Sequence, residues 1–338
     1  MAKIKLGIGM SHTPRLVSEP ADWLHFGSFA GSMGGFLDMD GSWISGPDLI
    51  KKYSDQFADQ AKLEVWQERY DLAQQSIARL AQAVKDADID VMIVLGDDQH
   101  ELFTRGNYPS VFVYSGTSFK MVDSKARAAR RGHHGMPEIV RGKIAQGWYM
   151  DANHLYPNHK PLAQAIIREM LIAGITPAVA DDNPADPSYG MGHAVGIVIT
   201  KLLQQEKTIP LVPILLNTYF PPNQPTPTIC WQVGQAIKRA VAALPDDLNV
   251  GVLASGGVSH FVVNEKWDRE ILNLLREGDE AKLMQVPVPM LQSGNSEMLN
   301  WIAMVSACQH LSAQWDVYTP IYSQPFGEGV GLAFAEWR

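Results

Sequence analysis

Short runs of apolar, often β-branched residues alternate along the chain with longer segments whose apolar positions recur at helical spacing. The short runs occupy residues 5–10, 91–95, 110–114, 176–180, 211–216 and 250–254, as expected of strands buried within a sheet. Segments 65–87, 161–173 and 229–244 lie between them and have the spacing of amphipathic helices. This alternation predicts an α/β fold with a central, mostly parallel sheet flanked by helices.

The longest helical segment, 65–87, is predicted to turn one apolar face toward the sheet. That face comprises Tyr70, Leu72, Ile77, Leu80, Ala81 and Val84. No repeat, low-complexity tract or clear linker divides the chain. We therefore expect a single domain over residues 1–338, with two inserted segments that could act as lids, 20–60 and 118–143.

The two inserted segments differ in composition. Segment 20–60 is rich in Gly, Trp, Phe and Met and has weak periodicity, whereas segment 118–143 is basic within an acidic protein. The second segment is interpreted as either a solvated helix face or a lid that attracts an acidic substrate. Its histidines, His133 and His134, are expected to be solvated. Its cations are Lys120, Lys125, Arg127, Arg130, Arg131, Arg141 and Lys143.

Composition narrows the class of protein. Of the 338 residues, 46% are hydrophobic and 19% are charged, so the chain can bury a sizeable core. The formal net charge of −8 argues against nucleic acid or an anionic membrane as the main partner. Cys230 and Cys308 form no C-x-x-C pair, so they are predicted to be buried free thiols. No apolar run is long enough to span a membrane, and we expect a cytoplasmic enzyme, by default a homodimer.

Polar residues that follow the predicted strands are the first candidates for a functional site, because ligands of open α/β sheets bind beyond the carboxyl ends of the strands. His12 follows the first strand, and His260 follows the strand at 250–254 after two glycines. Segment 96–101, Gly-Asp-Asp-Gln-His-Glu, gathers three acids, an amide and an imidazole at one strand end. Glu297 falls in the first turn of an apolar helix, where the helix dipole favours a carboxylate.

Histidines and a carboxylate at several strand ends can form an open metal site. Two histidines and one carboxylate on one face of the metal leave positions for O₂ and a chelating substrate, which is the non-haem Fe(II) arrangement. The same residue types could hold Zn²⁺ and activate water. Residue types and spacing leave both alternatives open.

The same motifs, in this order, resemble those of the class III extradiol ring-cleavage dioxygenases, typified by the β-subunit of protocatechuate 4,5-dioxygenase. The resemblance runs from about residue 5 to residue 335. Ser11-His12-Thr13-Pro14 is similar to the family's S-H-x-P, whose histidine binds iron. Glu297, four residues before a tryptophan, is similar to the iron-binding glutamate of its E-x-x-x-W. The resemblance therefore implies that His12 and Glu297 are Fe(II) ligands.

Two further histidines match motifs with catalytic roles. His260, in Gly-Gly-Val-Ser-His, is similar to the histidine of the family's G-G-x-S-H, which is the catalytic acid and base, and His193 lies where the family has a D-H-G histidine in the substrate pocket. The resemblance implies extradiol cleavage of a catechol-type ring by O₂ at a non-haem Fe(II) site. A carboxylate on the ring would meet a cation of segment 118–143. The alternatives are a zinc-dependent hydrolase or lyase on the same scaffold and a non-catalytic relative.

The chain departs from the family pattern at two positions of the site. The second iron-binding histidine of the family lies in a D-H-x-x-x-F motif, and an ungapped match to residues 98–103 puts Gln99 at that position. His100 is the better Fe(II) ligand chemically, but a shift of one residue can point a side chain the other way. Either Gln99 or His100 is therefore the expected second ligand. In addition, Gly192 precedes His193 in place of the aspartate.

The layout of the chain is closer to that of single-subunit members such as the 3-O-methylgallate dioxygenases. No counterpart of the small helical subunit of protocatechuate 4,5-dioxygenase is recognisable in the sequence. Segment 20–60 is the candidate to cover the site in its place.

Overall fold

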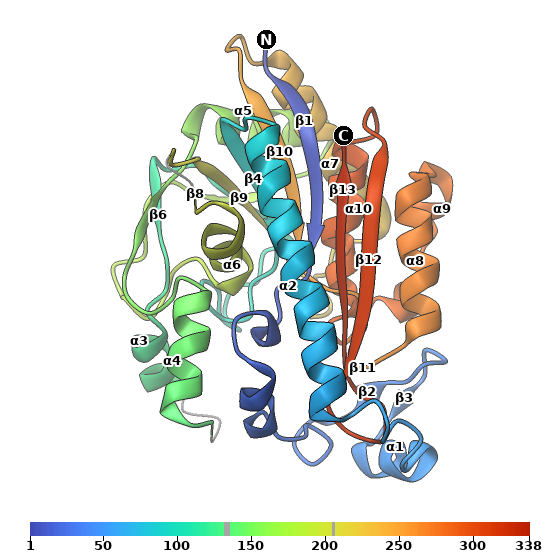
Figure 1. Ribbon diagram of the computed structural model, residues 1–338. Coiled ribbons are helices and arrows are strands. Elements are labelled where there is room, and N and C mark those ends of the chain that lie inside the picture. The colour runs from blue at the N-terminus through green and yellow to red at the C-terminus, as the bar shows by residue number, and fades with distance from the viewer. Residues whose placement is uncertain (132–135, 205–206) are drawn as a thin grey trace.

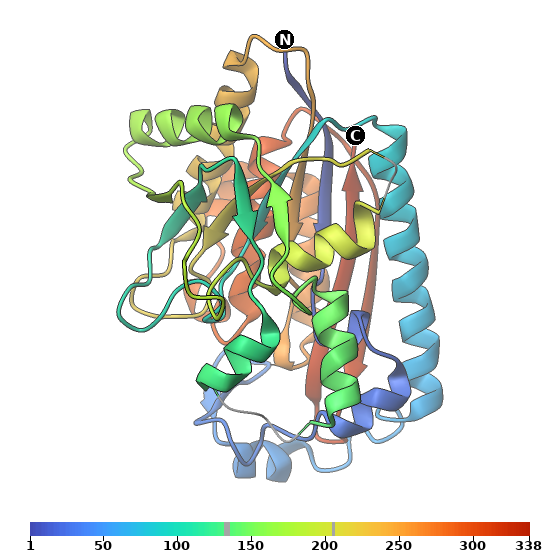
Figure 2. The same cartoon turned by 90° about the vertical axis from the view of Figure 1, so that its left-hand side faces the viewer.

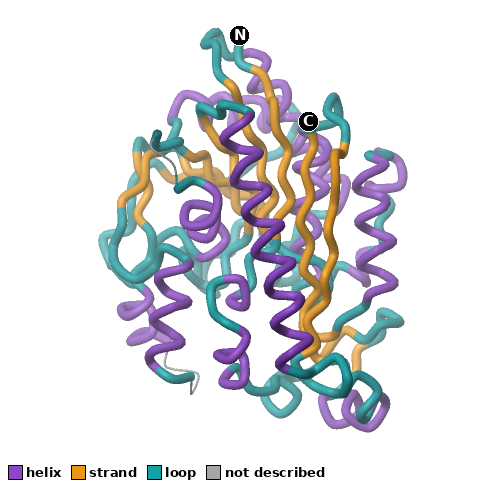
Figure 3. The backbone as a smooth tube through the Cα atoms, in the orientation of Figure 1, coloured by secondary structure: helices purple, strands orange, loops and turns teal. Residues whose placement is uncertain are grey.

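The computed structural model describes residues 1–338 except 132–135 and 205–206, so His133 and His134 lie outside the described residues. One sheet runs through the molecule, with helices on both of its faces (Figures 1 and 3). All six predicted strands are present, as β1 (Lys3–Met10), β4 (Val91–Gly96), β5 (Val111–Tyr114), β8 (Ala178–Ala180), β9 (Leu211–Leu216) and β10 (Asn249–Ser255). The three predicted helices are α2 (Leu63–Asp86), α5 (Lys160–Ile172) and α7 (Pro227–Ala243).

The remaining elements extend the sheet, cover it or build the connections. The further helices are α1 (Gly46–Tyr53), α3 (Ser124–Arg131), α4 (Glu138–Gly147), α6 (His193–Leu202), α8 (Glu265–Glu277), α9 (Glu280–Met284) and α10 (Met298–Ala307). The further strands are β2 (Phe36–Leu37), β3 (Trp43–Ile44), β6 (Ser118–Lys120), β7 (Leu155–Pro157), β11 (His260–Val262), β12 (Ala313–Tyr322) and β13 (Glu328–Trp337). Among the described residues, no helix is both long and apolar enough to cross a bilayer.

The central strands of the sheet are parallel. The strand order is β11-β13-β1-β10-β4-β9-β5-β8, with β12 beside β13. β10 pairs in parallel with β1 and β4, and β4 pairs in parallel with β9. Antiparallel pairs occur toward both edges, where β13 pairs with β1 and β5 pairs with β9. The predicted α/β class with a mostly parallel central sheet is therefore confirmed, and the carboxyl ends of β1, β10, β4 and β9 meet at one edge.

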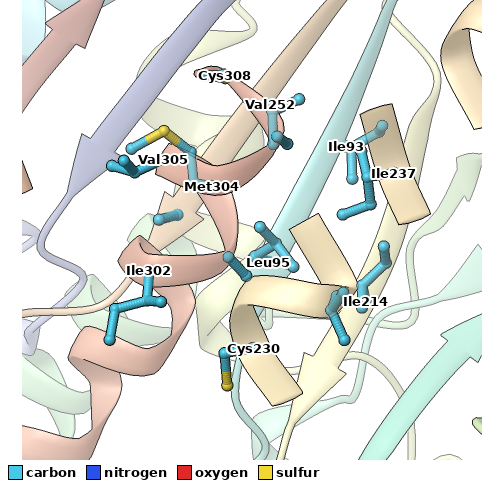
Figure 4. Close-up of a cluster of buried hydrophobic side chains, with 14 of the residues drawn as sticks. Ile93, Leu95, Ile214, Cys230, Ile237, Val252, Ile302, Met304, Val305 and Cys308 are labelled. Carbon is cyan, nitrogen blue, oxygen red and sulfur yellow. The ribbon is translucent and has the colours of Figure 1, made fainter. Parts of the chain in front are cut away.

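Each face of the sheet carries its own apolar core. Side chains alternate across the strands, so that Ile93 and Leu95 of β4 point to one face and Met92 and Val94 to the other. Helices α5, α7 and α10 cover the first face, and α2 and α6 cover the second (Figures 1 and 2). Figure 4 shows the first core, in which strand residues meet α7 and α10.

The two cysteines belong to this first core. Cys230 lies on α7 and Cys308 directly follows α10, and both are buried and free. The prediction of two buried free thiols is confirmed.

The apolar face of α2 differs in part from the predicted one. Ile77, Leu80 and Val84 are buried, but Leu72 is 40% exposed, so its assignment to that face was wrong. Trp66 and Ala73 are buried on the helix instead. Helix geometry explains why Ala73 rather than Leu72 is buried, because positions four and seven apart share one face of a helix. Ala73 lies four positions before Ile77 and seven before Leu80, whereas Leu72 lies five positions before Ile77.

Candidate metal centre

The site lies where the carboxyl ends of the parallel strands meet two helix N-termini. His12 follows β1 and Asp97 follows β4, on either side of the end of β10. His193 is the first residue of α6, and Glu297 directly precedes α10. Four stretches that are far apart in the sequence therefore converge at one sheet edge.

His12 is at the centre of this group. Its Nε2 lies 3.3 Å from Oε1 of Glu297 and 3.6 Å from Oδ1 of Asp97. Its ring meets that of His193 edge to face, with the centroids 4.5 Å apart. Side-chain ligand atoms of His12, Asp97 and His193 all lie within 4.8 Å of one another, and the three residues are buried. This donor set, two imidazoles and a carboxylate with a further carboxylate beside them, is the kind that binds a first-row divalent metal.

Unpartnered polar atoms support a metal at this position. Within the described part of the chain, neither Nε2 of His12 nor Oδ1 of Asp97 has a hydrogen-bond partner, although both atoms are buried. Buried polar groups without partners are rare in folded proteins because each costs free energy. One shared cation would satisfy both atoms. The residues present therefore fit a metal ion.

The charges of the site also favour a bound divalent metal. Burial alone would lower the pKa of His12, but the carboxylates of Glu297 and Asp97 raise it to about 9. Burial opposes ionisation of Glu297, yet the imidazoles of His260 and His12 hold the pKa of that carboxyl well below its usual range. Burial and the charge of Glu297 raise the pKa of Asp97. Protons balance the carboxylates in the metal-free site, and a divalent ion would take their place.

Two hydrogen bonds hold the carboxylate of Glu297. The hydroxyl of Tyr219 donates to its Oε1 at 2.7 Å, and the backbone N–H of Gly257 donates to its Oε2 at 2.6 Å. Gly256 has a φ of +150°, and a Cβ there would lie 2.8 Å from the Cβ of Glu297. The two glycines before Ser259-His260 therefore allow the backbone to approach this carboxylate closely.

His260 faces Glu297 from the other side. Its Nε2 lies 3.3 Å from Oε2 of Glu297, and its Nδ1 is 2.8 Å from the carbonyl oxygen of Val258. A carbonyl only accepts, so Nδ1 carries a proton, and Nε2 is the ring atom that faces Glu297. The side chain of His260 is 13% exposed, compared with 3% for His12 and 0% for Glu297. The side chain of His260 is thus more exposed to solvent than those of His12 and Glu297.

The residue before His260 is anchored by a buried carboxylate. Oδ1 of Asp268 accepts the backbone N–H of Ser259 at 2.9 Å, and its Oδ2 accepts the Ser259 hydroxyl at 2.5 Å. The hydroxyl of Tyr318 donates to the same Oδ2 at 2.7 Å. This network fixes the backbone from which His260 projects.

His193 is oriented by a carboxylate that does not precede it in the sequence. Its Nδ1 lies 3.0 Å from Oε1 of Glu101, which is also 3.1 Å from the Arg127 guanidinium. Trp148 packs beside His193 with the ring centroids 5.0 Å apart. Burial opposes ionisation of Glu101, but Arg127 and His193 hold the pKa of that carboxyl well below its usual range. The imidazole therefore donates from Nδ1 to Glu101.

The two candidates for the second iron ligand have different surroundings. The side-chain amide of Gln99 donates to Oδ2 of Asp97 at 3.2 Å. His100 has a positive φ of 66°, its ring is hydrogen-bonded to the hydroxyl of Tyr108, and it packs on Phe220 with the centroids 4.6 Å apart. The structure thus places Gln99 beside Asp97 and His100 against Tyr108 and Phe220.

Several cations of segment 118–143 have partners inside the protein. Arg127 and Arg130 donate to the carbonyl oxygens of Gln99 and His100, at 2.6 and 2.9 Å. Lys143 pairs with Asp22 of segment 20–60 at 2.9 Å. These residues stabilise the loop after β4 and join the two inserted segments.

Segment 20–60 lies next to the part of the chain that carries His260. The ring of Phe29 meets that of Phe261 edge to face at 5.5 Å, and the side-chain amide of Asn264 donates to the carbonyl oxygen of Met39 at 2.8 Å. Glu328, at the start of β13, accepts the backbone N–H of Phe29 at 3.0 Å.

Three residues of the site were given no individual role by the sequence: Asp97, Glu101 and Tyr219. Asp97 and Glu101 belong to the polar segment 96–101, which was recognised, but their directions could not be read from the sequence. Tyr219 follows β9, so the same search for polar residues after strands would have found it. Segments beyond all four central parallel strands thus contribute to the site.

The family assignment agrees with this geometry. The family described as the catalytic LigB subunit of aromatic ring-opening dioxygenase matches residues 58–331, and the chain belongs to this family. The match includes Asp97, His193, His260 and Glu297, whereas His12 precedes it. The predicted resemblance to the class III extradiol dioxygenases is thereby confirmed at the level of the family.

A curated relative is similar over part of the chain. Gallate dioxygenase from Pseudomonas putida is 27% identical over 193 residues, which cover 53% of this chain and 54% of the relative. The chain therefore aligns with about half the length of this relative.

Proposed function

We propose that the protein cleaves a catechol-type, carboxylated aromatic ring beside its diol, using O₂ at a non-haem Fe(II) site. The observation that carries the proposal is the convergence of His12, His193 and Glu297 in one buried group, with His260 at its more exposed side. Membership of a family of aromatic ring-opening dioxygenases supports the same reaction class.

His12 and Glu297 would hold the iron together with a residue of the loop after β4. The family's pattern offers Gln99 or His100 as that residue, and Asp97 lies at the start of the same loop. Bound Fe(II) supplies adjacent coordination positions for the diol and O₂ and lowers the pKa of a coordinated hydroxyl. Tyr219 and the N–H of Gly257 keep the Glu297 carboxylate oriented toward His12.

His260 is the proposed acid and base. Since its Nδ1 is held by the Val258 carbonyl, its Nε2 can take the proton of the second substrate hydroxyl and return it when the ring opens. His193 would form a hydrogen bond to bound substrate or oxygen through Nε2, with Glu101 holding the ring through Nδ1.

Segment 20–60 is proposed to cover the site. Its contacts with Phe261 and Asn264 place it beside His260, where it would limit the entry of water. The Arg127 and Arg130 contacts imply that segment 118–143 acts mainly by stabilising the loop after β4.

The test is an oxygen-electrode screen with protein loaded anaerobically with Fe(II). Gallate, 3-O-methylgallate and protocatechuate are the first substrates, and ring-opened products are followed by their absorbance. Stoichiometric O₂ uptake that requires Fe(II) and is lost in His260→Ala supports the proposal. Turnover with Zn²⁺ in the absence of O₂ would instead support the hydrolase or lyase, and no O₂ uptake with any substrate would reject ring cleavage.

A further inference from the structure

Asp97 occupies the position at the end of β4 from which a metal ligand would be expected. Its side chain has no exposed surface. Oδ2 accepts the amide of Gln99 at 3.2 Å, while Oδ1 lies 3.6 Å from Nε2 of His12. Within the described ranges, neither Oδ1 of Asp97 nor Nε2 of His12 has a hydrogen-bond partner. A buried carboxylate oxygen and a buried imidazole nitrogen that face each other in this way are best satisfied by one cation between them.

The neighbouring residues orient Asp97 toward that position. The Gln99 amide binds the oxygen that points away from His12, which leaves Oδ1 directed at Nε2. An outer hydrogen bond of this kind commonly fixes the direction of a ligating carboxylate. The His100 ring is bonded to Tyr108, and its backbone carbonyl is bonded to Arg130. The loop thus turns the carboxylate of Asp97 inward and the His100 ring toward Tyr108.

We propose that Asp97 is a metal ligand and takes the place of the second iron-binding histidine of the family, beside His12 and Glu297. Gln99 is then a positioning residue that orients Asp97. The inference rests on the proposed function for the identity of the ion, but the role of Asp97 holds for any divalent metal at this site. Ligand atoms of Asp97, His12 and His193 lie within 4.8 Å of one another. The proposed role of Asp97 does not require that His193 also binds the metal.

An exchange of imidazole for carboxylate changes the metal preference. Carboxylate oxygen is a harder donor and adds a negative charge, which favours Mn²⁺ relative to metals that prefer imidazole. The metal-free protein bears a cost for this arrangement, because Asp97 is buried beside the carboxylate of Glu297. A carboxylate retained for metal binding should therefore destabilise the metal-free protein, whereas a purely structural one should stabilise it.

Mn²⁺ binding to protein stripped of metal tests the inference. Equilibrium dialysis with detection of free Mn²⁺ by electron paramagnetic resonance should show one ion per chain. Asp97→Asn keeps the shape of the side chain and should weaken binding by at least about tenfold, because loss of an outer partner alone typically costs 10- to 100-fold. His100→Ala should bind within about twofold of the unchanged protein. Equal affinity in Asp97→Asn, or a tenfold loss in His100→Ala alone, would overturn the inference.

Thermal unfolding gives a second readout that does not depend on activity. Metal-free Asp97→Asn should melt at the same temperature as the metal-free parent or higher, and a given Mn²⁺ concentration should raise the midpoint of the parent more than that of the variant. A lower midpoint of the metal-free variant, with metal stabilisation retained, would assign Asp97 a structural role.

These outcomes separate the inference from the proposed function. If Mn²⁺ binding depends on Asp97 but the Fe(II)-loaded protein takes up no O₂ with any carboxylated catechol, the ligand assignment stands and ring cleavage is rejected. If the protein cleaves catechols while Asp97→Asn retains its metal, ring cleavage stands and the ligand assignment is rejected.

Discussion

The side chain of Glu101 fills the space that a side chain at Gly192 would need. A Cβ on Gly192 would lie 2.5 Å from Cγ and 2.7 Å from Cδ of Glu101. The same carboxylate binds Nδ1 of His193 and the guanidinium of Arg127. At the position where the family's D-H-G pattern has aspartate, this chain thus has glycine, and the loop after β4 supplies a carboxylate from Glu101.

Gly192→Ala should therefore displace Glu101 from His193. We expect a loss of stability of about 1–3 kcal/mol, because overpacking a buried site forces neighbours to shift. Ring-cleavage turnover should fall by about ten- to a hundredfold, as expected when a positioned group moves by about an ångström. Denaturant unfolding and oxygen uptake measure the two effects.

Gly142→Ala in α4 is the matched control. A Cβ at Gly142 meets nothing within 4 Å, so this change should leave turnover intact and stabilise the helix by up to about 1 kcal/mol. Full activity of Gly192→Ala would show that His193 does not need the Glu101 carboxylate.

The sequence was sufficient to predict the central strands and the helices between them, because their apolar patterns repeat with clear periods. It did not predict the hairpin of β12 and β13. β13 is buried along its length, but Gly, Ala and Glu interrupt its larger apolar residues, so it lacks the continuous apolar run that marks β9. Its position depends on pairing with β1 and β12, which only tertiary structure provides.

Residues of the candidate site could be located from the sequence where they stand beside the end of a helix or strand. In the loop after β4, consecutive side chains point in different directions, and the sequence does not show which of them face the site. His12, His193, His260 and Glu297 each stand beside the end of an element or close to it, and the structure brings all four together. In the loop after β4, His100 adopts a left-handed backbone conformation with a φ of 66°, which the spacing of residues does not reveal. Spacing alone could not determine that Asp97 and Glu101 point into the site.

His260→Ala should abolish proton transfer without removing the metal. A positioned general acid or base typically contributes 10²- to 10⁴-fold, so turnover of the Fe(II)-loaded variant should fall within that range. Metal content should remain near that of the unchanged protein, because His260 is not among the proposed ligands. His154→Ala removes an imidazole that pairs with Asp151 instead, and this control should retain turnover. Loss of metal in His260→Ala would contradict the separation of roles.

Phe29→Ala tests whether segment 20–60 covers the site. Phe29 is 41% exposed and contacts Phe261, so its removal should cost no more than about 1.5 kcal/mol of stability. If the segment closes over bound substrate, KM should rise several-fold and O₂ uptake should become less tightly coupled to product. Leu24→Ala, at a 67% exposed position of the same segment, should change neither quantity. Unaltered KM and coupling in Phe29→Ala would exclude a covering role for this contact.

The buried carboxylate of Asp268 predicts a pH dependence of stability. Burial raises its pKa from 3.8 to about 7, the charge of Glu265 adds to this, and hydrogen bonds from Ser259 and Tyr318 oppose it. Between about pH 4 and 7 the folded protein keeps this proton while the unfolded chain has lost it, so its contribution to the free energy of unfolding falls as pH rises through that window and is constant above it. Across this window, the contribution of Asp268 to the free energy of unfolding changes by at most about 4 kcal/mol.

Asp268→Asn removes this titration and keeps the shape of the side chain. The free energy of unfolding of the parent, minus that of Asp268→Asn, should therefore decrease between about pH 4 and 7, in urea titrations at closely spaced pH values. Tyr318→Phe removes a donor to the ionised carboxylate, so it should raise the pKa of Asp268 further and extend the decrease to higher pH. A difference that does not vary with pH would mean that Asp268 stays ionised across the window, stabilised by its three hydrogen bonds beside His260.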